Sequence, residues 1–347
     1  MHALTFHGIH DLRYDRVADP ALRAPTDAIV RVRVAAICGS DLHVWHGRET
    51  GLDEGTVMGH EFVGEVVEAG SAVRRFRRGD RVVAPFTTSC GECRFCRLGL
   101  TARCIRGELF GWVQGGAGLH GGQADLVRVP LADTTLAALP PELPDETALL
   151  LGDVLATGYH AARLAETGPG RVCAVVGCGP VGLMAILSAS ELGAETVYAV
   201  DSVPERLEFA ARLGAVPLPL AQEPVARAQE ATEGFGMDAV LECVGAPAAL
   251  RLAFDLVRPG GTISAVGVHH EPSMPFSPGE AYDRNLTFRS GRCPARAYFE
   301  SLLVIADRHR ESLAAMFTHR VPLAEAPAAY AMFADRSSGC VKVALRP

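Results

Sequence analysis

Four cysteines that lie close together in the chain have the spacing of a metal site. Cys90, Cys93, Cys96 and Cys104 fall within fifteen residues, in the segment TSCGECRFCRLGLTARC. Four thiolates can surround one Zn²⁺ tetrahedrally, which leaves no coordination position open for a substrate. We therefore expect a structural zinc that orders a polar, glycine-rich loop. Reduced thiols, two disulfides or an iron–sulfur cluster are the alternative uses of these residues.

A second group of potential ligands is spread along the chain. Cys38 follows an apolar run, His60 and Glu61 precede another, and Asp153 interrupts a Leu-, Val- and Ala-rich stretch of helical length. A carboxylate buried in such a stretch must be paired or bound to metal. Cys, His and one carboxylate from separate segments are typical of a catalytic zinc, whose fourth position stays open. Taken singly, Cys38 or His60 would more often be a packed core residue.

A glycine-rich turn follows the Val-rich run 171–176 and opens an apolar stretch. It has the GxGxxG pattern, formed by Gly177, Cys178, Gly179, Pro180, Val181 and Gly182. The glycines permit a tight turn, the approach of a pyrophosphate and close packing of a helix on a sheet, and the proline suits a first helical turn. A plain tight turn is the alternative interpretation.

An acidic residue supports the dinucleotide interpretation. The next apolar run ends in Asp201, nineteen positions beyond Gly182, where a carboxylate binds both ribose hydroxyls. The same carboxylate would repel the extra phosphate of NADP, so we predict a preference for NAD(H). Arg206 lies close by in the sequence and weakens that preference.

The elements that must position these residues differ between two parts of the chain. Before residue 145 the chain has short apolar runs separated by turn signals, at 28–37, 61–68 and 81–85, which indicates a β-rich domain. Beyond it, stretches of helical length alternate with Val-rich strands at 171–176, 196–200, 238–244 and 261–268. Strand, helix, strand at this spacing predicts a parallel, doubly wound sheet.

The predicted protein is therefore an α/β protein with an inserted domain. We expect a β-rich catalytic domain in residues 1–145, with a zinc-bearing lobe at 88–106. A dinucleotide-binding domain follows in 146–284, and residues 285–347 return to the first domain. The crevice between two such domains is the natural place for a ligand.

Composition limits the classes of function. The chain has 347 residues, of which 48% are hydrophobic and 21% charged, as in ordinary globular proteins. Its formal charge of −7 disfavours a nucleic-acid surface and leaves a small molecule as the expected partner. The N-terminus has no signal-peptide pattern, and no run of eighteen apolar residues occurs, so we expect a cytoplasmic protein without a membrane segment.

Residues 59–73, GHEFVGEVVEAGSAV, resemble the signature of the zinc-containing alcohol dehydrogenases. The match covers every defining position, which are Gly59, His60, Glu61, Gly64, Gly70 and Val73. The order of elements along the whole chain is similar to that of the medium-chain dehydrogenase family, in which a GroES-like catalytic domain carries an inserted Rossmann domain. The resemblance implies an NAD-dependent enzyme that exchanges a hydride with primary, secondary or cyclic alcohols and their carbonyl forms. It also implies two zinc ions per subunit, one catalytic and one structural, and a homotetramer.

The resemblance assigns roles to particular residues. It makes Cys38, His60 and Asp153 the ligands of the catalytic zinc, with Glu61 as an exchangeable ligand, and Ser40 and His43 a proton relay. Residues expected beside the cofactor are Cys243, Val244, Gly245, Gly267 and Val268 on the nicotinamide side and Lys342 near the pyrophosphate.

The substrate stays open at this point. Many members of the family have a cysteine where this chain has Asp153, and the aspartate is similar to a branch that includes formaldehyde and polyol dehydrogenases. Trp45, His46, Trp112 and Leu119 either line an apolar pocket or only pack the β-rich domain. A zinc-binding regulatory protein without enzymatic activity is the remaining alternative, and the charge of −7 together with Ser40 and His43 argues against it.

Overall fold

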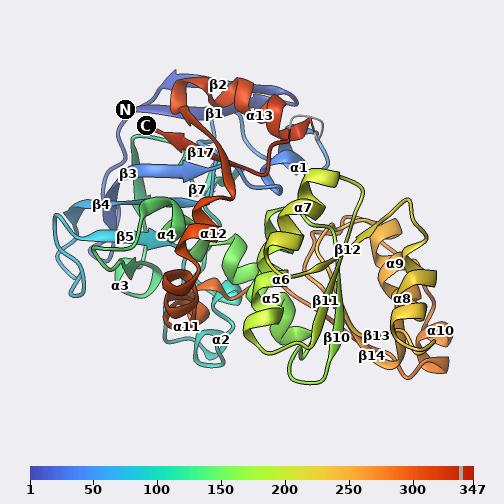
Figure 1. Ribbon diagram of the computed structural model, residues 1–347. Coiled ribbons are helices and arrows are strands. Elements are labelled where there is room, and N and C mark those ends of the chain that lie inside the picture. The colour runs from blue at the N-terminus through green and yellow to red at the C-terminus, as the bar shows by residue number, and fades with distance from the viewer. Residues whose placement is uncertain (336–338) are drawn as a thin grey trace. The chain divides into compact units, whose positions relative to one another are not determined.

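The computed structural model describes residues 1–335 and 339–347, which form two compact units (Figure 1). Unit 1 consists of Met1–Asp153 and Pro294–Pro347, and unit 2 of Val154–Cys293. The two boundaries lie later in the chain than the predicted ones after residues 145 and 284. The GroES-like domain with an inserted parallel α/β domain is confirmed as the fold class.

Unit 1 is organised around a seven-stranded sheet. Its order is β16-β17-β3-β4-β5-β9, and β8 pairs with β3. The strands are β3 (Ala28–Ala36), β4 (Phe62–Ala69), β5 (Arg81–Ala84), β8 (Leu126–Val129), β9 (Ala137–Ala138), β16 (Phe317–Pro322) and β17 (Lys342–Arg346). Two antiparallel pairs lie outside this sheet, β1 (His2–Gly8) with β2 (Asp11–Arg16) and β6 (Trp112–Gln114) with β7 (Ala117–Leu119). Alternate residues of β3 are buried in its middle, as expected for a strand with one face on a core.

The helices of unit 1 are mostly short. They are α1 (Asp41–Trp45), α2 (Arg94–Arg97), η1 (Thr101–Arg103), α3 (Ala132–Thr135), α4 (Asp145–Leu151), α11 (Ala295–Arg308), α12 (Arg310–Ala314), η2 (Leu323–Glu325) and α13 (Ala326–Ala334). The side chain of Tyr330 on α13 is fully buried in the same apolar core as Phe62 of β4 and Phe110. The C-terminal helix is therefore part of the core beneath the sheet.

Four arginines hold α4 in place. Asp145 accepts hydrogen bonds from Arg33 of β3 at 2.8 Å and from Arg81 of β5 at 2.6 Å. Glu146 accepts from Arg320 of β16 and Arg346 of β17, each at 2.7 Å. These acidic residues occupy the first turn of α4, where they also favour the helix dipole. The helix that leads to Asp153 is thus attached to four strands.

Unit 2 contains a six-stranded parallel sheet with the order β12-β11-β10-β13-β14-β15. The strands are β10 (Val172–Val176), β11 (Thr196–Asp201), β12 (Val216–Pro219), β13 (Met237–Glu242), β14 (Val257–Ala265) and β15 (Thr287–Ser290). The helices are α5 (Val154–Leu164), α6 (Pro180–Glu191), α7 (Pro204–Arg212), α8 (Pro224–Ala231), α9 (Pro247–Leu256) and α10 (Pro278–Asp283). Five of them begin with a proline, whose missing N–H costs nothing in a first turn.

The strand β15 accounts for the difference between the predicted second boundary, after residue 284, and the end of unit 2 at Cys293. Residues 285–291 were expected to return to the catalytic domain, but Thr287–Ser290 pair in parallel with Thr262–Ala265 of β14. The strand completes one edge of the unit 2 sheet, and the chain enters unit 1 only at Pro294. At the first boundary, α4 packs on β3, β4 and β5 and so belongs to unit 1.

No helix in residues 1–335 or 339–347 is both long enough and apolar enough to cross a membrane.

Candidate functional site

Four potential metal ligands that are far apart in the sequence meet inside unit 1. One ligand atom from each of Cys38, His60, Glu61 and Asp153 lies within 4.8 Å of the others. The Cys38 thiol donates a hydrogen bond to Asp153 Oδ2 at 3.1 Å, and His60 Nε2 lies 3.3 Å from the same oxygen. The structure therefore brings together all four residues that the sequence proposed for this site.

The antiparallel pairing of β3 and β4 explains how the cluster forms. Cys38 comes two residues after β3, and His60 and Glu61 immediately precede β4. The last residue of β3 that pairs with β4, Ala35, is opposite Phe62, the first residue of β4, so that the end of one strand meets the start of the other. Asp153 follows the C-terminal end of α4. The residue between them, Gly152, lies so close to the carbonyl oxygen of Ala84 that a Cβ on it would overlap that oxygen.

Burial and close contact shift the pKa values of the groups in this cluster. Burial and the neighbouring Asp153 carboxylate raise the pKa of the Cys38 thiol to about 12. Burial also opposes ionisation of Asp153, but the hydrogen bond and charge of His60 outweigh it and hold that pKa below its usual range. Glu61 Oε2 is buried without a hydrogen-bond partner. A thiol, an imidazole and two carboxylates, one with an orphaned oxygen, fit a divalent zinc ion, whose charge would favour the thiolate.

An aspartate that sequence analysis missed orients the histidine. Asp41 Oδ1 lies 3.2 Å from His60 Nδ1, and Asp41 Oδ2 accepts the backbone N–H of Cys38 at 2.9 Å. A metal-binding histidine commonly donates its second ring nitrogen to a carboxylate, which fixes the tautomer that presents the other nitrogen. Asp41 lies between Ser40 and His43 in the sequence. Its position as an acidic residue inside the predicted relay motif was the only sequence feature that pointed to this role.

Lys342 pairs with a residue of the ligand cluster. It is the only lysine in the chain, and its side chain and that of Glu61 are both fully buried. The ammonium group donates to Glu61 Oε1 at 2.5 Å and to the carbonyl oxygen of Ile37 at 3.2 Å. Its predicted role at a pyrophosphate stays a prediction, whereas its position beside the metal cluster is a contact that the sequence did not suggest.

The two predicted relay residues lie at α1. Ser40 is the residue before the helix, and its Oγ is 3.4 Å from His60 Nε2. His43 lies in the helix itself and is half-buried. The structure thus places Ser40 at the cluster and leaves the passage of a proton to His43 as a prediction.

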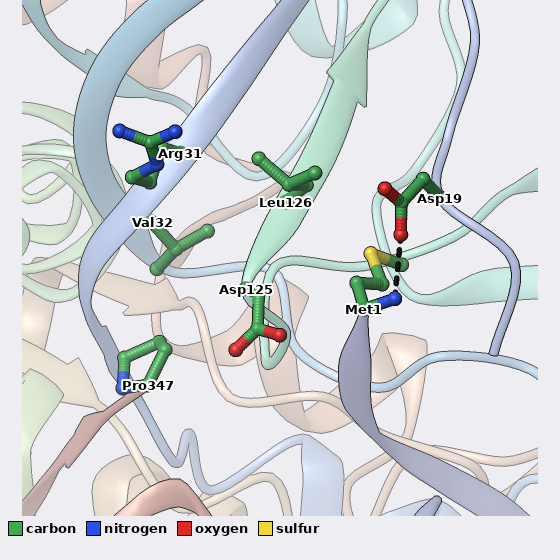
Figure 2. Close-up of a pocket in the computed structure, with 7 residues that line it drawn as sticks. All are labelled: Met1, Asp19, Arg31, Val32, Asp125, Leu126 and Pro347. Atoms are coloured by element: carbon green, nitrogen blue, oxygen red, sulfur yellow. Dashed lines mark hydrogen bonds and ion pairs between the residues drawn. The ribbon is translucent and has the colours of Figure 1, made fainter. Parts of the chain in front are cut away.

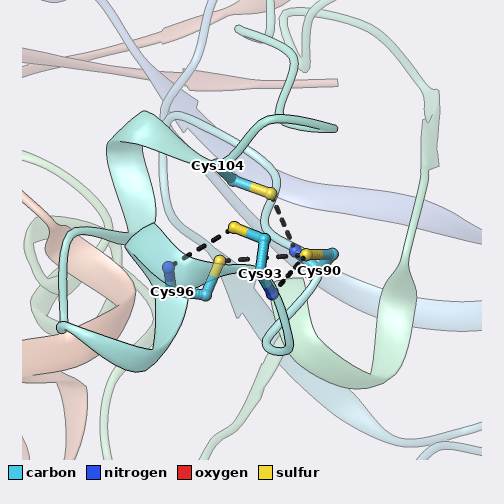
Figure 3. A group of neighbouring side chains, drawn as sticks. All are labelled: Cys90, Cys93, Cys96 and Cys104. Carbon is cyan, nitrogen blue, oxygen red and sulfur yellow. Dashed lines mark hydrogen bonds between the residues drawn. The ribbon is translucent and has the colours of Figure 1, made fainter.

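The four cysteines of the lobe also converge (Figure 3). Their sulfur atoms lie within 4.8 Å of one another, and those of Cys90 and Cys96 are 4.0 Å apart. Burial opposes ionisation of Cys90, but hydrogen bonds from the backbone and from Arg106 outweigh it and lower its pKa to about 6. Such a set of sulfurs, with backbone N–H groups of Cys93 and Cys96 directed at them, fits a closed tetrahedral zinc site.

The glycine fingerprint of unit 2 has the geometry of a dinucleotide turn. Gly177 adopts a φ of +89°, and a Cβ on Gly182 would overlap the carbonyl oxygen of Gly177. Gly179 faces open space, since the nearest atom to a Cβ there is Arg206 Nη1 at 4.0 Å. The turn therefore ends at the half-buried N-terminus of α6, where backbone N–H groups can bind a phosphate.

Asp201 lies at the end of β11, next to this turn. Its carboxylate accepts the backbone N–H groups of Cys178 at 2.7 Å and Val203 at 2.9 Å, and Arg206 Nη1 lies 3.9 Å from Oδ2. The carboxylate is thus fixed beside the fingerprint, as the prediction of a ribose-binding acid requires.

The remaining predicted cofactor residues gather at the ends of β13 and β14. Val244 and Val268 are each 43% exposed, and Gly245 and Gly267 approach so closely that a Cβ on either would overlap the other turn. Sequence analysis missed the buried Glu242 beneath them. It accepts the N–H groups of Val244 and Gly245 at 2.8 Å and contacts His269 Nε2 at 2.9 Å.

The residues proposed for an apolar pocket contact one another in two groups. The Trp45 ring packs against those of His10 and His46, with centroid distances of 4.2 and 4.7 Å, and Trp112 pairs with Leu119 across β6 and β7. Their role in a substrate pocket stays a prediction. A separate cavity of about 380 Å³ lies beside the chain termini and is lined by Met1, Arg31, Asp125 and Pro347 among others (Figure 2). It contains none of the predicted site residues.

Comparisons with known proteins show which family has this fold. Residues 24–141 match the family model for the alcohol dehydrogenase GroES-like domain, and residues 180–307 match that for zinc-binding dehydrogenases. A medium-chain reductase/dehydrogenase of an Acremonium species is 46% identical over 82% of this chain and 98% of its own. The NADP-dependent isopropanol dehydrogenase of Thermoanaerobacter brockii is 35% identical over 85% of each chain. The structure of an alcohol dehydrogenase from Thermus sp. ATN1 has a TM-score of 0.94 and 42% identity, over 100% of this chain and 99% of that one.

A pair of glycine substitutions tests the fingerprint geometry. Gly182→Ala would place a methyl group on the Gly177 carbonyl oxygen, and we expect it to lower the stability of unit 2 by about 1–3 kcal/mol. Gly179→Ala meets no atom closer than 4.0 Å and should unfold at the wild-type temperature. Thermal unfolding of both variants measures this difference. Equal melting temperatures would show that the close approach of the turn and α6 is wrong.

The buried ion pair gives a second prediction. Lys342→Met leaves the Glu61 carboxylate buried without its cation, and we expect a loss of about 3–5 kcal/mol in the free energy of unfolding. Arg346→Met removes an exposed ion pair with Glu146 from the same strand and should cost about 0–1 kcal/mol. Urea denaturation at fixed metal content compares the two variants. Similar costs for both would contradict a buried Glu61–Lys342 pair.

Proposed function

The chain belongs to the zinc-containing alcohol dehydrogenases of the medium-chain dehydrogenase family, and from this we propose that it exchanges a hydride reversibly between NAD(H) and a primary, secondary or cyclic alcohol or its carbonyl form. The convergence of Cys38, His60 and Asp153 inside unit 1 is the observation that carries the proposal. Three protein ligands from separate segments leave one coordination position for a substrate oxygen.

The protein's own groups have distinct tasks in this mechanism. When bound, Zn²⁺ supplies Lewis-acid polarisation of the substrate oxygen, which favours departure of a hydride to the nicotinamide ring. Cys38 and Asp153 contribute two negative charges that balance the metal charge, and Asp41 keeps His60 in the tautomer whose Nε2 is free to bind. Ser40 Oγ accepts the alcohol proton as its own proton moves on toward His43, which passes a proton to solvent. Glu61, with its unpaired oxygen, serves as an exchangeable ligand.

The cofactor proposal is a preference for NAD(H), bound by two groups of unit 2 residues. The fingerprint residues Gly177, Gly179, Pro180, Val181 and Gly182, with Asp201 and Arg206, bind the pyrophosphate and the adenosine ribose. Cys243, Val244, Gly267 and Val268 line the nicotinamide side, and we keep Lys342 as a candidate for the pyrophosphate. The fixed Asp201 carboxylate supports NAD(H), because a 2′-phosphate would approach its negative charge. The Thermoanaerobacter brockii relative is NADP-dependent, so the cofactor must be tested.

Polyol or formaldehyde dehydrogenase is the second candidate, because Asp153 replaces the cysteine of many members of the family. Oxidation of NADH in the presence of ketones and aldehydes, and reduction of NAD with polyols and formaldehyde, separates the candidates when zinc is measured on the same preparation. Two zinc ions per subunit and turnover of simple carbonyls support the first candidate. Turnover of polyols or formaldehyde alone supports the second, and one zinc ion without turnover would support a regulatory protein instead.

We also propose a cytoplasmic homotetramer, on the resemblance to bacterial members of the family. Light scattering during size-exclusion chromatography determines the mass. A monomer near 36.8 kDa would contradict the tetramer.

Substitution of a ligand tests the catalytic zinc. Asp153→Ala should remove one of two zinc ions per subunit and abolish turnover, because the site loses a ligand and a negative charge while the four-cysteine site is untouched. His43→Ala is the matched control: it should retain both zinc ions, slow turnover by roughly 10²-fold and shift the pH profile. Metal analysis and steady-state kinetics measure both effects. A fully active Asp153→Ala variant with two zinc ions would refute the ligand assignment.

The cofactor preference has its own test. Wild-type protein should show a higher kcat/KM with NADH than with NADPH, and Asp201→Ala should reduce the ratio by roughly tenfold or more, because hydrogen bonds from the ribose to a charged group are lost. Glu205→Ala, which removes a neighbouring exposed acid in α7, should leave the ratio unchanged. Equal efficiency of wild-type protein with both cofactors would contradict the proposal.

A further inference from the structure

We propose that Gln123 and Tyr330 are positioning residues for the metal site, which act through Asp41 and determine how firmly Cys38 and His60 hold the metal. This inference rests on the proposed function, since it concerns the same catalytic zinc. Neither residue carries a role in the family signature of residues 59–73.

A continuous chain of hydrogen bonds leads from α13 to the ligands. The Tyr330 hydroxyl donates to Gln123 Oε1 at 2.9 Å. Gln123 Nε2 donates to the carbonyl oxygen of Ala36 at 2.9 Å and, over a longer distance of 3.4 Å, to Asp41 Oδ2. Asp41 then contacts His60 Nδ1 at 3.2 Å and the backbone N–H of Cys38 at 2.9 Å. One carboxylate therefore connects two metal ligands to a helix more than two hundred residues away.

The direction of each hydrogen bond fixes the orientation of the Gln123 amide. Its NH₂ group faces two acceptors, Ala36 O and Asp41 Oδ2, and its carbonyl oxygen faces the Tyr330 hydroxyl. A flipped amide would direct Oε1 at the Asp41 carboxylate, which repels it, and NH₂ at a hydroxyl. The two acceptors, Ala36 O and Asp41 Oδ2, thus select the orientation in which Gln123 donates to Asp41, and the Tyr330 O–H satisfies the amide oxygen in that orientation.

Burial makes these hydrogen bonds consequential. Tyr330 and Gln123 are fully buried and Asp41 is 4% exposed, so water cannot replace a lost partner. A buried polar group that loses its hydrogen-bond partner destabilises the fold far more than an exposed one does. Its neighbours then rearrange to satisfy it. Loss of Tyr330 or Gln123 therefore weakens the support of Asp41, whose two oxygens contact His60 and Cys38.

The backbone leaves Gln123 little freedom to move. Its N–H donates to the carbonyl oxygen of Met58 at 2.9 Å, and its side chain packs on Gly59, where a Cβ would overlap Gln123 Cγ. Gly59 adopts a φ of +90° and directly precedes His60. Gln123 therefore touches the segment that presents His60 from one side and supports Asp41 from the other.

Release of zinc to a chelator tests the proposal with a readout other than activity. Tyr330→Phe removes only the hydroxyl, and we expect the catalytic zinc to be released at least tenfold faster, within the 10-fold to 100-fold range typical of outer partners of metal ligands. The zinc of the four-cysteine lobe serves as an internal control whose release rate should not change. Tyr159→Phe, a buried tyrosine of unit 2, is the matched control and should leave both rates at wild-type values.

A double-mutant cycle separates positioning from general destabilisation. Gln123→Met and Tyr330→Phe should each accelerate zinc release, and the double variant should be no faster than the stronger single variant, because both act through one path. Additive effects, or wild-type release from Tyr330→Phe, would overturn the proposal. If Tyr330→Phe fails to fold, Gln123→Met alone still tests it, with wild-type release as the contradictory result. Wild-type protein with a single zinc ion and no turnover would instead refute the proposed function.

Discussion

Concentrated buried charge where β3 ends and β4 begins is the constraint on which the rest of unit 1 depends. Cys38, Glu61 and Asp153 can each carry negative charge in one buried space, where His60 contacts Asp153 and the single lysine, Lys342, pairs with Glu61. Burial of such groups is unfavourable unless each charge is paired. The ion pair of Glu61 with Lys342 compensates one carboxylate, and a divalent cation is the natural partner of the remaining groups.

The framework around the cluster fixes each ligand from a different direction. Arginines on four strands hold α4, which leads to Asp153. Pairing of β3 with β4 aligns Cys38 with His60, and Asp41, supported by Gln123 and Tyr330, orients the imidazole. A metal site with an open position needs this rigidity, because the protein and not the metal must define where a substrate oxygen can bind.

The sequence predicted those parts of this arrangement that depend on short, local motifs. The ligands, the four-cysteine lobe and the glycine fingerprint stand in short segments whose residue types limit what they can do. The partners of these residues were missed, because Glu61 and Lys342, or Gln123 and Tyr330, lie hundreds of positions apart and only folding brings them together. The predicted boundary near 284 differs from the end of unit 2 at Cys293 for the same reason, since the pairing of β15 with β14 is not visible in residues 285–291.

Anomalous X-ray diffraction at the zinc absorption edge, on crystals of the purified protein, would locate each zinc ion relative to its ligands. We expect two peaks per subunit, one at bonding distance from Cys38, His60 and Asp153 and one at the centre of Cys90, Cys93, Cys96 and Cys104. A peak in the lobe alone, in crystals grown with sufficient zinc, would show that the buried cluster balances its charges without a metal and would contradict the account.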